Sequence, residues 1–320
     1  MICLTSLIFI IVRLVNELIY EYLMSKPPYP SVAFWQDNRT YQTGRSRPVP
    51  ITTIDKVNLT NFTLVITACC RNVEKHLVGF QKNVRAIGAL FRYYRLYLAE
   101  SDSDDGTLKF IQEWEKNDSD HVSVHSAGRQ RWRQFFRKHC TSCSLSELSF
   151  QRARTEMPWF DYYFVLDVDV TSSETFSVNN FLTNFIYPLS SWAVMTASQI
   201  NFYYDTWALR SWPTITYDFL EQARQASFFS IPWNSAIKRA VDVHNKGIPR
   251  NHPLIEVQSA FGGAAIYAAQ YLSKECAYNG WMDHGWWFTR EQCEHVSFNQ
   301  CVRRNAGGGK FFINPQFQTV

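Results

Sequence analysis

The sequence predicts an α/β fold in which a doubly wound, mostly parallel sheet is sandwiched by helices. Two observations predict it. Short apolar runs rich in β-branched residues alternate with segments of helical periodicity, each roughly 10 to 20 residues long. The chain has 320 residues, enough to bury a substantial core in one large domain or two small ones. Together they indicate a globular chain built from successive strand and helix units.

These units follow one another from residue 62. We expect strands at 62–70, 95–101, 121–126 and 162–170, and helices at 73–93, 106–117 and 145–157. The first strand, FTLVITACC, has the β-branched run of a buried strand. In doubly wound sheets, ligands bind outside the carboxyl ends of the strands. Arg71, Glu100 and Asp169 fall at these ends.

The stretch YYFVLDVDV, residues 162–170, is the most informative feature of the chain. Side chains of an extended strand alternate between faces, so we expect Asp167 and Asp169 to project to the same side. Carboxylate oxygens suit Mg²⁺ or Mn²⁺, and two charges at the end of an apolar strand are costly without a cation. The pattern therefore indicates a divalent-metal site. The alternative is that the strand ends here and the acids face water.

The acidic segment SDSDDGT, residues 101–107, was compared with a calcium loop. An EF-hand needs acids at positions 1, 3 and 5, glycine at 6 and glutamate at 12. With Gly106 at position 6, serines occupy positions 1 and 3, and Gln112 occupies position 12. Calcium is excluded on this pattern. The segment instead predicts a polar turn that caps a helix starting near Thr107.

Composition and charge indicate the class of partner. The net charge of +4 suits anionic small molecules and gives no case for nucleic acid. Aromatic residues make up 16% of the chain, which favours a deep core together with stacking or sugar-binding surfaces.

The eight cysteines do not form a recognisable framework. Cys69 and Cys70 lie in an apolar run and are interpreted as small core residues. Cys140 and Cys143 form one CxxC, but a structural zinc site needs four ligands and no second pair follows at suitable spacing. We interpret Cys140 and Cys143 as a loop disulfide or as free thiols. The cysteines do not indicate whether the protein works in a reducing or an oxidising compartment.

The N-terminal part divides into two segments before the expected domain. Residues 1–24 contain the apolar run 2–12, whose eleven residues reach only ~17 Å as a helix, short of a ~30 Å hydrocarbon core. They are an ordinary packed helix or a weak membrane anchor. Residues 25–57, rich in Pro, Arg and Thr, are interpreted as an irregular stem, and 58–320 as the main domain.

Four N-x-[ST] sequons start at Asn38, Asn58, Asn61 and Asn117. They favour a membrane-associated or secretory-pathway lumenal location over the cytoplasm.

Three segments of the first half resemble GT-A type glycosyltransferases: VITACCRNVE, YLAESDSDDGTLKFI and QRARTEMPWFDYYFVLDVDV. Two segments of the second half, YYDTWALRSW (203–212) and QSAFGGAAIY (258–267), are similar to motifs of the fungal capsule-associated α-1,3-mannosyltransferase family. With CEHVSF (293–298), the resemblance covers roughly residues 62–314. The ordered set SDDGT, DxD, GG and EH is more specific than the short DxD motif alone. CEH departs from the commoner Glu-Asp pair of many GT-A enzymes.

The resemblance implies a GT-A-like fold and transfer of a hexose, with mannose as the family-level expectation. The donor would be a GDP- or UDP-sugar, and the acceptor a hydroxyl of a glycan or glycoconjugate. In GT-A enzymes the DxD motif holds a metal against the donor diphosphate. Asp167 and Asp169 are thus the implied ligands of Mn²⁺ or Mg²⁺, which would stabilise the leaving group. The imidazole of His295 is a candidate third ligand.

Donor binding is expected from a wider set of residues, namely Arg71, Glu100, Arg154, Asp167, Gly262 and Gly263. GT-A enzymes place an acid that contacts the base or ribose where Glu100 lies; the alternative is an acid that stabilises a turn. Arg154 would offer a planar donor to phosphate, or would be solvated helix surface. The paired glycines allow close approach of a ligand, or simply a tight turn with positive φ.

Glu294 and Asp283 are the candidate catalytic residues. Many inverting GT-A enzymes keep a general base at the place of Glu294. A retaining enzyme, as the mannosyltransferase resemblance suggests, needs no such base, and Glu294 or Asp283 would then bind acceptor hydroxyls.

Two other classes of function remain open. One is a non-catalytic carbohydrate-binding or scaffold protein of the same fold, against which the retention of both DxD acids argues. The other is a sugar nucleotidyltransferase, which would be expected to show a Gly-rich phosphate loop near the first strand. The segment CCRNVEK has no glycine.

Overall fold

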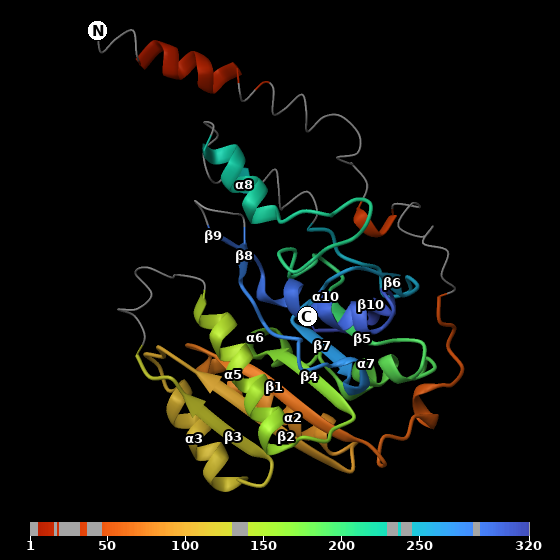
Figure 1. Cartoon of the computed structure of the whole chain (residues 1–320). Helices are drawn as coiled ribbons and strands as arrows, with labels where there is room; N and C mark the ends of the chain where they lie inside the picture. Colours follow the sequence, from red (N-terminus) through yellow and green to blue (C-terminus); the bar gives the residue numbers. More distant parts are fainter. Residues whose placement is uncertain are drawn as a thin grey trace.

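The computed structural model describes residues 6–15, 18, 33–36, 47–129, 140–228, 236–237, 245–283 and 289–319 (Figure 1). The side chains of 140–143, 225–228, 281–283 and 289–291 are outside this description. The predictions for Asn38, for the thiols of Cys140 and Cys143 and for the carboxyl group of Asp283 therefore lie outside the described parts.

Within the described residues, eight strands form one central sheet in the order β3-β2-β1-β4-β7-β5-β10-β6. Their bounds are β1 Thr63–Cys70, β2 Tyr93–Glu100, β3 Val122–Ser126, β4 Tyr162–Asp167, β5 Val194–Ser198, β6 Ile255–Glu256, β7 Ala264–Ala268 and β10 Phe311–Gln318. A separate hairpin pairs β8 (Trp281–Asp283) with β9 (Thr289–Glu291).

Most neighbouring strands of the central sheet run parallel. The β3-β2-β1-β4 half is parallel throughout, and β5 pairs with β10 in the same sense. Strand β7 lies antiparallel between β4 and β5, and β6 is antiparallel to β10. The expected mostly parallel α/β sheet is confirmed. Its carboxyl-terminal rim is shared by β1, β4 and β5, since two reversals at β7 restore the strand direction.

Helices α2, α3 and α5 confirm the three helices that the sequence predicted, and the other described helices were not predicted. Their bounds are α2 Glu74–Gly88, α3 Thr107–Asn117, α5 Cys140–Glu156, α6 Val168–Thr171, α7 Val178–Leu182, α8 Phe219–Phe228 and α10 Glu294–Asn305; four 3₁₀ turns are η1 Phe34–Gln36, η3 Ile54–Lys56, η4 Thr183–Phe185 and η6 Ala269–Tyr271. Helix α2 ends five residues before the expected 93 because Tyr93 and Tyr94 enter the ladder with β1. Aromatic residues favour strands, and the pairing decides the boundary.

Side chains of the sheet alternate between two apolar cores, one on each face. In β4, Phe164 and Leu166 belong to the core that includes α2 and α3, whereas Tyr163 and Val165 belong to the core that includes α5 and α10. Helices therefore cover both faces, as Figure 1 shows. The same alternation directs Asp167 towards α5 and α10.

The DxD segment differs from the expected continuous strand. Strand β4 ends at Asp167, and Val168–Thr171 forms the short helix α6, which includes Asp169. The argument that Asp167 and Asp169 share a face of one strand is therefore wrong. The chain turns because the Thr171 hydroxyl donates to the Asp167 carbonyl at 2.5 Å, a hydrogen bond four residues back that fits a helical turn.

The polar turn expected at 101–107 is present, and it joins two helices. The Asp105 carboxylate accepts hydrogen bonds from the backbone nitrogens of Thr107 in α3 and Glu74 in α2, at 3.0 and 3.1 Å. The Glu74 carboxylate in turn accepts one from the Gly106 nitrogen at 2.9 Å. Burial alone would raise the pKa of Asp105, but these hydrogen bonds lower it below the ordinary value. The turn thus fixes the starts of α2 and α3 together.

Gly262 and Gly263 form the positive-φ turn that their pairing predicted, with φ of 66° and 79°. A Cβ at Gly262 would lie 2.2 Å from the Ala197 carbonyl oxygen, so only glycine fits. The Gly263 oxygen accepts a hydrogen bond from the Asp167 nitrogen at 2.9 Å. The Gln199 side chain donates to the Gly262 oxygen at 2.8 Å. The turn therefore fixes the backbone at Asp167.

A disulfide joins Cys276 to Cys301, with 5.4 Å between the Cα atoms. It attaches α10 to the segment that follows η6. The spacing of 25 residues matched no framework, and the sequence analysis did not foresee this pair. Cys69, Cys70 and Cys293 are free thiols.

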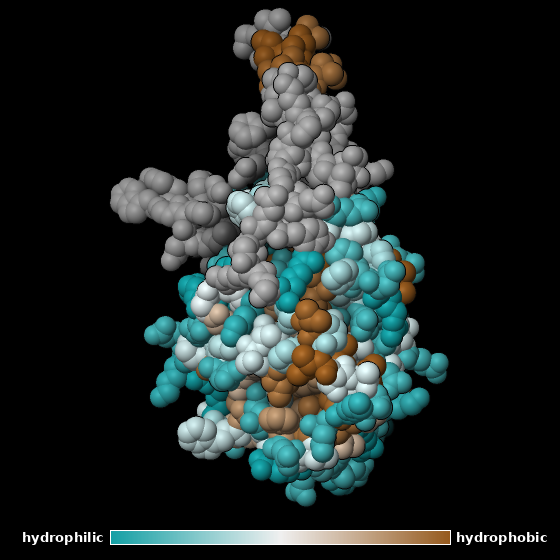
Figure 2. Space-filling view, turned by 90° about the vertical axis from the view of Figure 1, so that its right-hand side faces the viewer, coloured by the Kyte–Doolittle hydropathy of each residue, from teal (hydrophilic) through white to brown (hydrophobic). Residues whose placement is uncertain are grey.

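The N-terminal segments also have described parts. Residues 6–15 are helical and their apolar side chains are exposed, as the brown cluster in Figure 2 shows; Phe9 is 67% exposed. Among the described helices, none combines the length and apolar character needed to cross a bilayer. Phe34, within the segment interpreted as a stem, is fully buried and packs edge-on against Tyr203.

The turn at Gly262 gives a first testable prediction. Gly262→Ala should lower the free energy of unfolding by about 3 kcal/mol or more, because a positive φ and a clash with Ala197 add together. Gly307→Ala is the matched control: φ there is 76°, but no atom lies within 4 Å of the added Cβ. It should cost only about 1–2 kcal/mol. Urea unfolding measures both, and equal losses would contradict the packing argument.

Candidate functional site

A cavity of about 730 Å³ lies at the carboxyl ends of β1 and β4. This volume is in the range of small-molecule sites. Its walls come from the ends of both strands, from α5, α6 and the start of α10, and from the segment that follows β5. The residues that line the cavity include Cys69, Arg71, Asp167, Asp169, Tyr204, Asp205, Trp207, Phe261, Cys293, Glu294 and His295.

Asp167 and Asp169 both line the cavity although they are not on one strand. Asp167 is half-buried at the end of β4, opposite Cys69 in the ladder with β1. Asp169 is exposed, and its Oδ1 accepts a hydrogen bond from the Val170 nitrogen at 3.0 Å. The turn into α6, rather than strand alternation, brings the two carboxylates to one cavity.

Negative charge accumulates around Asp167. Burial raises its pKa well above the ordinary value, and the charges of Asp169, Asp205 and Glu294 raise it further. A hydrogen bond with Tyr204 opposes this rise. Several carboxylates that disfavour one another's ionisation in a partly enclosed space create a strong demand for a cation.

Asp205 is a cavity residue that the sequence analysis missed. Burial raises its pKa, and the nearby His295 lowers it. Its Oδ1 accepts a hydrogen bond from the Ala208 nitrogen at 3.1 Å. The motif YYDTWALRSW contained it, but no spacing rule connects a loop aspartate with a DxD pair nearly forty residues earlier. Only the fold brings them together.

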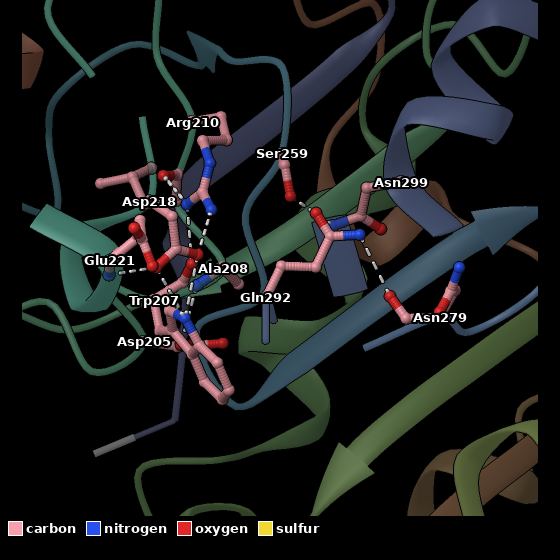
Figure 3. Close-up of polar contacts among 11 residues, drawn as sticks. Asp205, Trp207, Ala208, Arg210, Asp218, Glu221, Ser259, Asn279, Gln292 and Asn299 are labelled. Carbon is pink, nitrogen blue, oxygen red and sulfur yellow. Dashed lines mark hydrogen bonds and ion pairs between the residues drawn. The ribbon is translucent and has the colours of Figure 1, made fainter. Parts of the chain in front are cut away.

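A buried ion pair holds the segment that contains Asp205, as Figure 3 shows. Arg210 donates to Asp218 at 2.7 Å, and these side chains are 8% and 4% exposed. Arg210 also donates to the carbonyl oxygens of Trp207 and Leu209, both at 2.8 Å. The Trp207 indole nitrogen donates to both carboxylate oxygens of Asp218, at 3.2 and 3.0 Å. The paired charges are thus well supplied with hydrogen bonds, as buried ions require.

Glu294 and His295 start helix α10, and each is 8% exposed. The imidazole of His295 stacks on Phe261 with ring centroids 4.0 Å apart, and Tyr278 meets it edge-on at 5.6 Å. Its buried Nδ1 has no hydrogen-bond partner. A buried, unpartnered imidazole nitrogen is costly, which makes His295 a candidate to contact a ligand.

The predicted metal ligands were tested against this geometry. Among the described side chains, no group of three His, Cys, Asp or Glu converges closely enough to hold an ion. Asp167, Asp169 and His295 line one cavity, but they do not form the expected three-residue ligand set. Mg²⁺ in nucleotide sites commonly takes one or two carboxylates together with substrate phosphates. The acidic donor set around Asp167 fits such a cation, and a ligand role for His295 stays a prediction.

Four of the expected donor-binding residues, Glu100, Arg154, Gly262 and Gly263, are not part of the cavity wall. A Cβ at Gly262 would meet the Ala197 backbone, and one at Gly263 would meet the Val170 side chain. Both carboxylate oxygens of Glu100 accept internal hydrogen bonds, from the Ser103 nitrogen at 2.9 Å and the Ser126 hydroxyl at 2.6 Å. Glu100 is buried and has the geometry of the turn-stabilising alternative.

Of the two arginines expected to bind the donor, only Arg71 lines the cavity. Arg71 is exposed and lines the cavity, just after β1. Arg154 does not: it donates to the Ser273 carbonyl at 3.2 Å, lies over the Phe150 ring, and lines a different hollow near the start of β4. Arg154 lies in the last turn of α5, near the start of β4, whereas the DxD motif lies at the other end of β4. Residues that are close in sequence are therefore far apart in space here.

Three thiols line the cavity, those of Cys69, Cys70 and Cys293, and burial raises the pKa of each. Burial raises the pKa of Cys69 to about 12, partly offset by a hydrogen bond with Ser146. Burial also raises the pKa of Cys293 well above its usual value. A raised pKa favours the protonated thiol, which is a poor nucleophile.

No protein-family model matches the chain, and a search of curated proteins found no match. Distant likenesses exist among solved structures. Mannosyltransferase PcManGT from Pyrobaculum calidifontis, in complex with GDP-Man and Mn²⁺, has 9% identity and a TM-score of 0.41, and the match covers 86% of this chain and 58% of that one. S. aureus TarS 1-349, in complex with UDP, has 9% identity and a TM-score of 0.41, covering 78% and 57%. Mannosyltransferase Ktr4p from S. cerevisiae has 12% identity and a TM-score of 0.31, covering 82% and 73%. The chain spans less than two thirds of the length of the first two.

Proposed function

We propose that this chain is a metal-dependent glycosyltransferase. It moves a hexose, with mannose as the first expectation, from a nucleotide-diphosphate sugar to a hydroxyl of a glycan or glycoconjugate. One observation carries the proposal: a cavity at the carboxyl ends of parallel strands gathers Asp167, Asp169, Asp205 and Glu294. The order of the sequence motifs that resemble glycosyltransferases supports it.

The acids of the cavity suit a cation that is shared with a diphosphate. Asp167 and Asp169 would hold Mn²⁺ or Mg²⁺, with the remaining ligands supplied by phosphate oxygens and water. When bound, the metal supplies Lewis-acid stabilisation to the departing diphosphate. Arg71, on the cavity wall, is placed to add a planar cationic donor to a phosphate or to the base.

Glu294 is the residue of this chain best placed to act on the acceptor. It is buried at the start of α10 and lines the same cavity as the DxD acids. In an inverting reaction it would take the proton of the acceptor hydroxyl; in a retaining one it would orient that hydroxyl. Asp283, the last residue of β8, remains a second candidate.

Three features support a lumenal or membrane-associated location. The disulfide Cys276–Cys301 is of the kind that persists in oxidising compartments. The sequon asparagines Asn58, Asn61 and Asn117 are all exposed. The apolar residues of helix 6–15 would give interfacial membrane contact.

The metal role predicts the effect of Asp169→Asn. The asparagine oxygen keeps the hydrogen bond from Val170, so the fold should survive. Release of GDP from GDP-mannose in the presence of Mn²⁺ should fall about a thousandfold, because several kcal/mol of charge stabilisation are lost. Excess EDTA should have the same effect on the wild-type protein. Glu113→Gln, an exposed acid of α3, is the control.

Full activity of Asp169→Asn, or of the wild type in EDTA, would count decisively against the metal role. The products separate the other candidate functions. A nucleotidyltransferase would release pyrophosphate from a nucleoside triphosphate and a sugar phosphate, whereas a scaffold protein would release neither product.

The raised pKa of Asp167 predicts how stability depends on pH. A carboxyl group whose pKa is higher in the folded state binds more protons there, so stability falls as pH rises from about 4 towards that raised value. Without metal, the melting temperature should therefore decline over this range. Asp167→Asn should flatten the decline, whereas the exposed Asp120→Asn should not. Mn²⁺ should restore stability at neutral pH; an unchanged slope in Asp167→Asn would refute the assignment.

A further inference from the structure

Asp205 and Trp207 lie on the segment that follows β5, and both line the acidic cavity. Neither belongs to the DxD motif or to α10. We propose that these two side chains form a pyranose-binding subsite, in which the indole stacks on the apolar C–H face of a sugar and the carboxylate accepts hydrogen bonds from its hydroxyls. The inference rests on the proposed function and names the residues that recognise the sugar.

Trp207 is held by its indole nitrogen and by packing against the apolar core that includes α5 and α10. Its indole nitrogen is anchored to both oxygens of Asp218, which the buried ion pair with Arg210 keeps in place. In Figure 3 the six-membered ring points away from this anchor. The ring is half-buried and forms part of the cavity wall. An aromatic platform for a ligand gains affinity from being fixed in advance.

Asp205 supplies the polar half of the subsite. The Ala208 nitrogen donates to its Oδ1 at 3.1 Å, which sets the orientation of the carboxylate. A carboxylate has about four acceptor positions, so the group retains capacity for sugar hydroxyls. Asp205 is half-buried, close enough to His295 and Glu294 for their charges to act on it. A sugar there would lie near the candidate catalytic acid.

The segment is also tied to residues 258–259 and, through Ser259, to α10. The Arg210 nitrogen donates to the Ser259 oxygen at 2.8 Å, and the Gln258 nitrogen donates to the Arg210 oxygen at 2.8 Å. The Ser259 hydroxyl accepts a hydrogen bond from Asn299 of α10 at 3.0 Å. Figure 3 shows the contact between Ser259 and Asn299 beside the ion pair. The sugar-facing residues and α10 are thus held as one unit.

An aromatic face next to a hydrogen-bond acceptor is the chemistry that a pyranose requires. One side of the ring presents C–H groups, and its rim presents hydroxyls. Indole supplies the largest apolar face of any side chain and stacks with a defined geometry. Nucleoside bases also stack on tryptophan, but their flat faces are not rimmed by hydroxyl groups that donate to a carboxylate. The pair therefore favours the sugar part of a ligand.

The experiment measures sugar binding with the phosphate part kept constant. Calorimetry in Mn²⁺ compares GDP with GDP-mannose, and saturation-transfer NMR in GDP and Mn²⁺ detects methyl α-mannopyranoside and methyl α-glucopyranoside. The variants are Trp207→Ala, Trp207→Phe and the isosteric Asp205→Asn. Trp159→Ala is the control, because Trp159 is 87% exposed and lines the hollow near the start of β4. Circular dichroism checks folding; if Trp207→Ala does not fold, Trp207→Phe and Asp205→Asn decide.

Two results support the subsite and identify which sugar it holds. If it holds the donor sugar, Trp207→Ala removes the affinity gain of GDP-mannose over GDP, about three- to twelvefold, and leaves GDP binding unchanged. If it holds the acceptor sugar, the variant loses the pyranoside signal at the same GDP affinity. Asp205→Asn should reduce whichever of the two is affected, the affinity gain of GDP-mannose or the pyranoside signal. Trp207→Phe should retain part of that gain or signal, and Trp159→Ala should leave it unchanged.

The opposite results overturn the proposal. Suppose that GDP binds with Mn²⁺, but the variants change neither the affinity gain of GDP-mannose over GDP nor the pyranoside signal. The subsite is then refuted while the proposed function stands, and the same holds if the wild type shows neither the gain nor the signal. If the wild type binds no nucleotide with metal, the proposed function and the subsite fail together.

Discussion

The site depends on holding several carboxylates together against their mutual repulsion. Asp167, Asp169, Asp205 and Glu294 come from three separate parts of the chain, and each charge disfavours ionisation at Asp167. Such a cluster does not form by itself, since like charges in a partly enclosed space separate unless the backbone prevents it. The free energy that keeps them in place comes from the apolar cores on the two faces of the sheet.

Each acid is fixed through its backbone. The positive-φ turn at Gly263 holds the nitrogen of Asp167, and the Arg210–Asp218 ion pair supports the segment that carries Asp205. The disulfide to Cys301 holds α10, whose first turn carries Glu294. The charged side chains of the cavity are consequently left to meet a cation and a ligand. This division between fixed backbone and available side chains is what a preorganised site requires.

Local patterns predicted the strands and helices of the first half, because periodicity and β-branched runs act over a few residues. They failed where long-range packing decides. Asp169 lies in α6 and does not extend β4, and Arg154 lies near the start of β4, away from the cavity. Asp205 and the pairing of Cys276 with Cys301 depend on segments that meet only in the folded chain. The DxD motif identified the region of the site, but not its full set of acids.

The placement of β7 has a consequence for folding during synthesis. Strands β1 to β4 pair among themselves and are complete once residue 167 has emerged, but the other edge of β4 is covered only by residues 264–268. For roughly a hundred residues of synthesis, β4, which ends at Asp167 and is followed by Asp169 in α6, has an open edge. Its terminal charges then act as gatekeepers against edge-to-edge association. The same carboxylates would oppose association of the nascent chain before they contact a ligand in the folded protein.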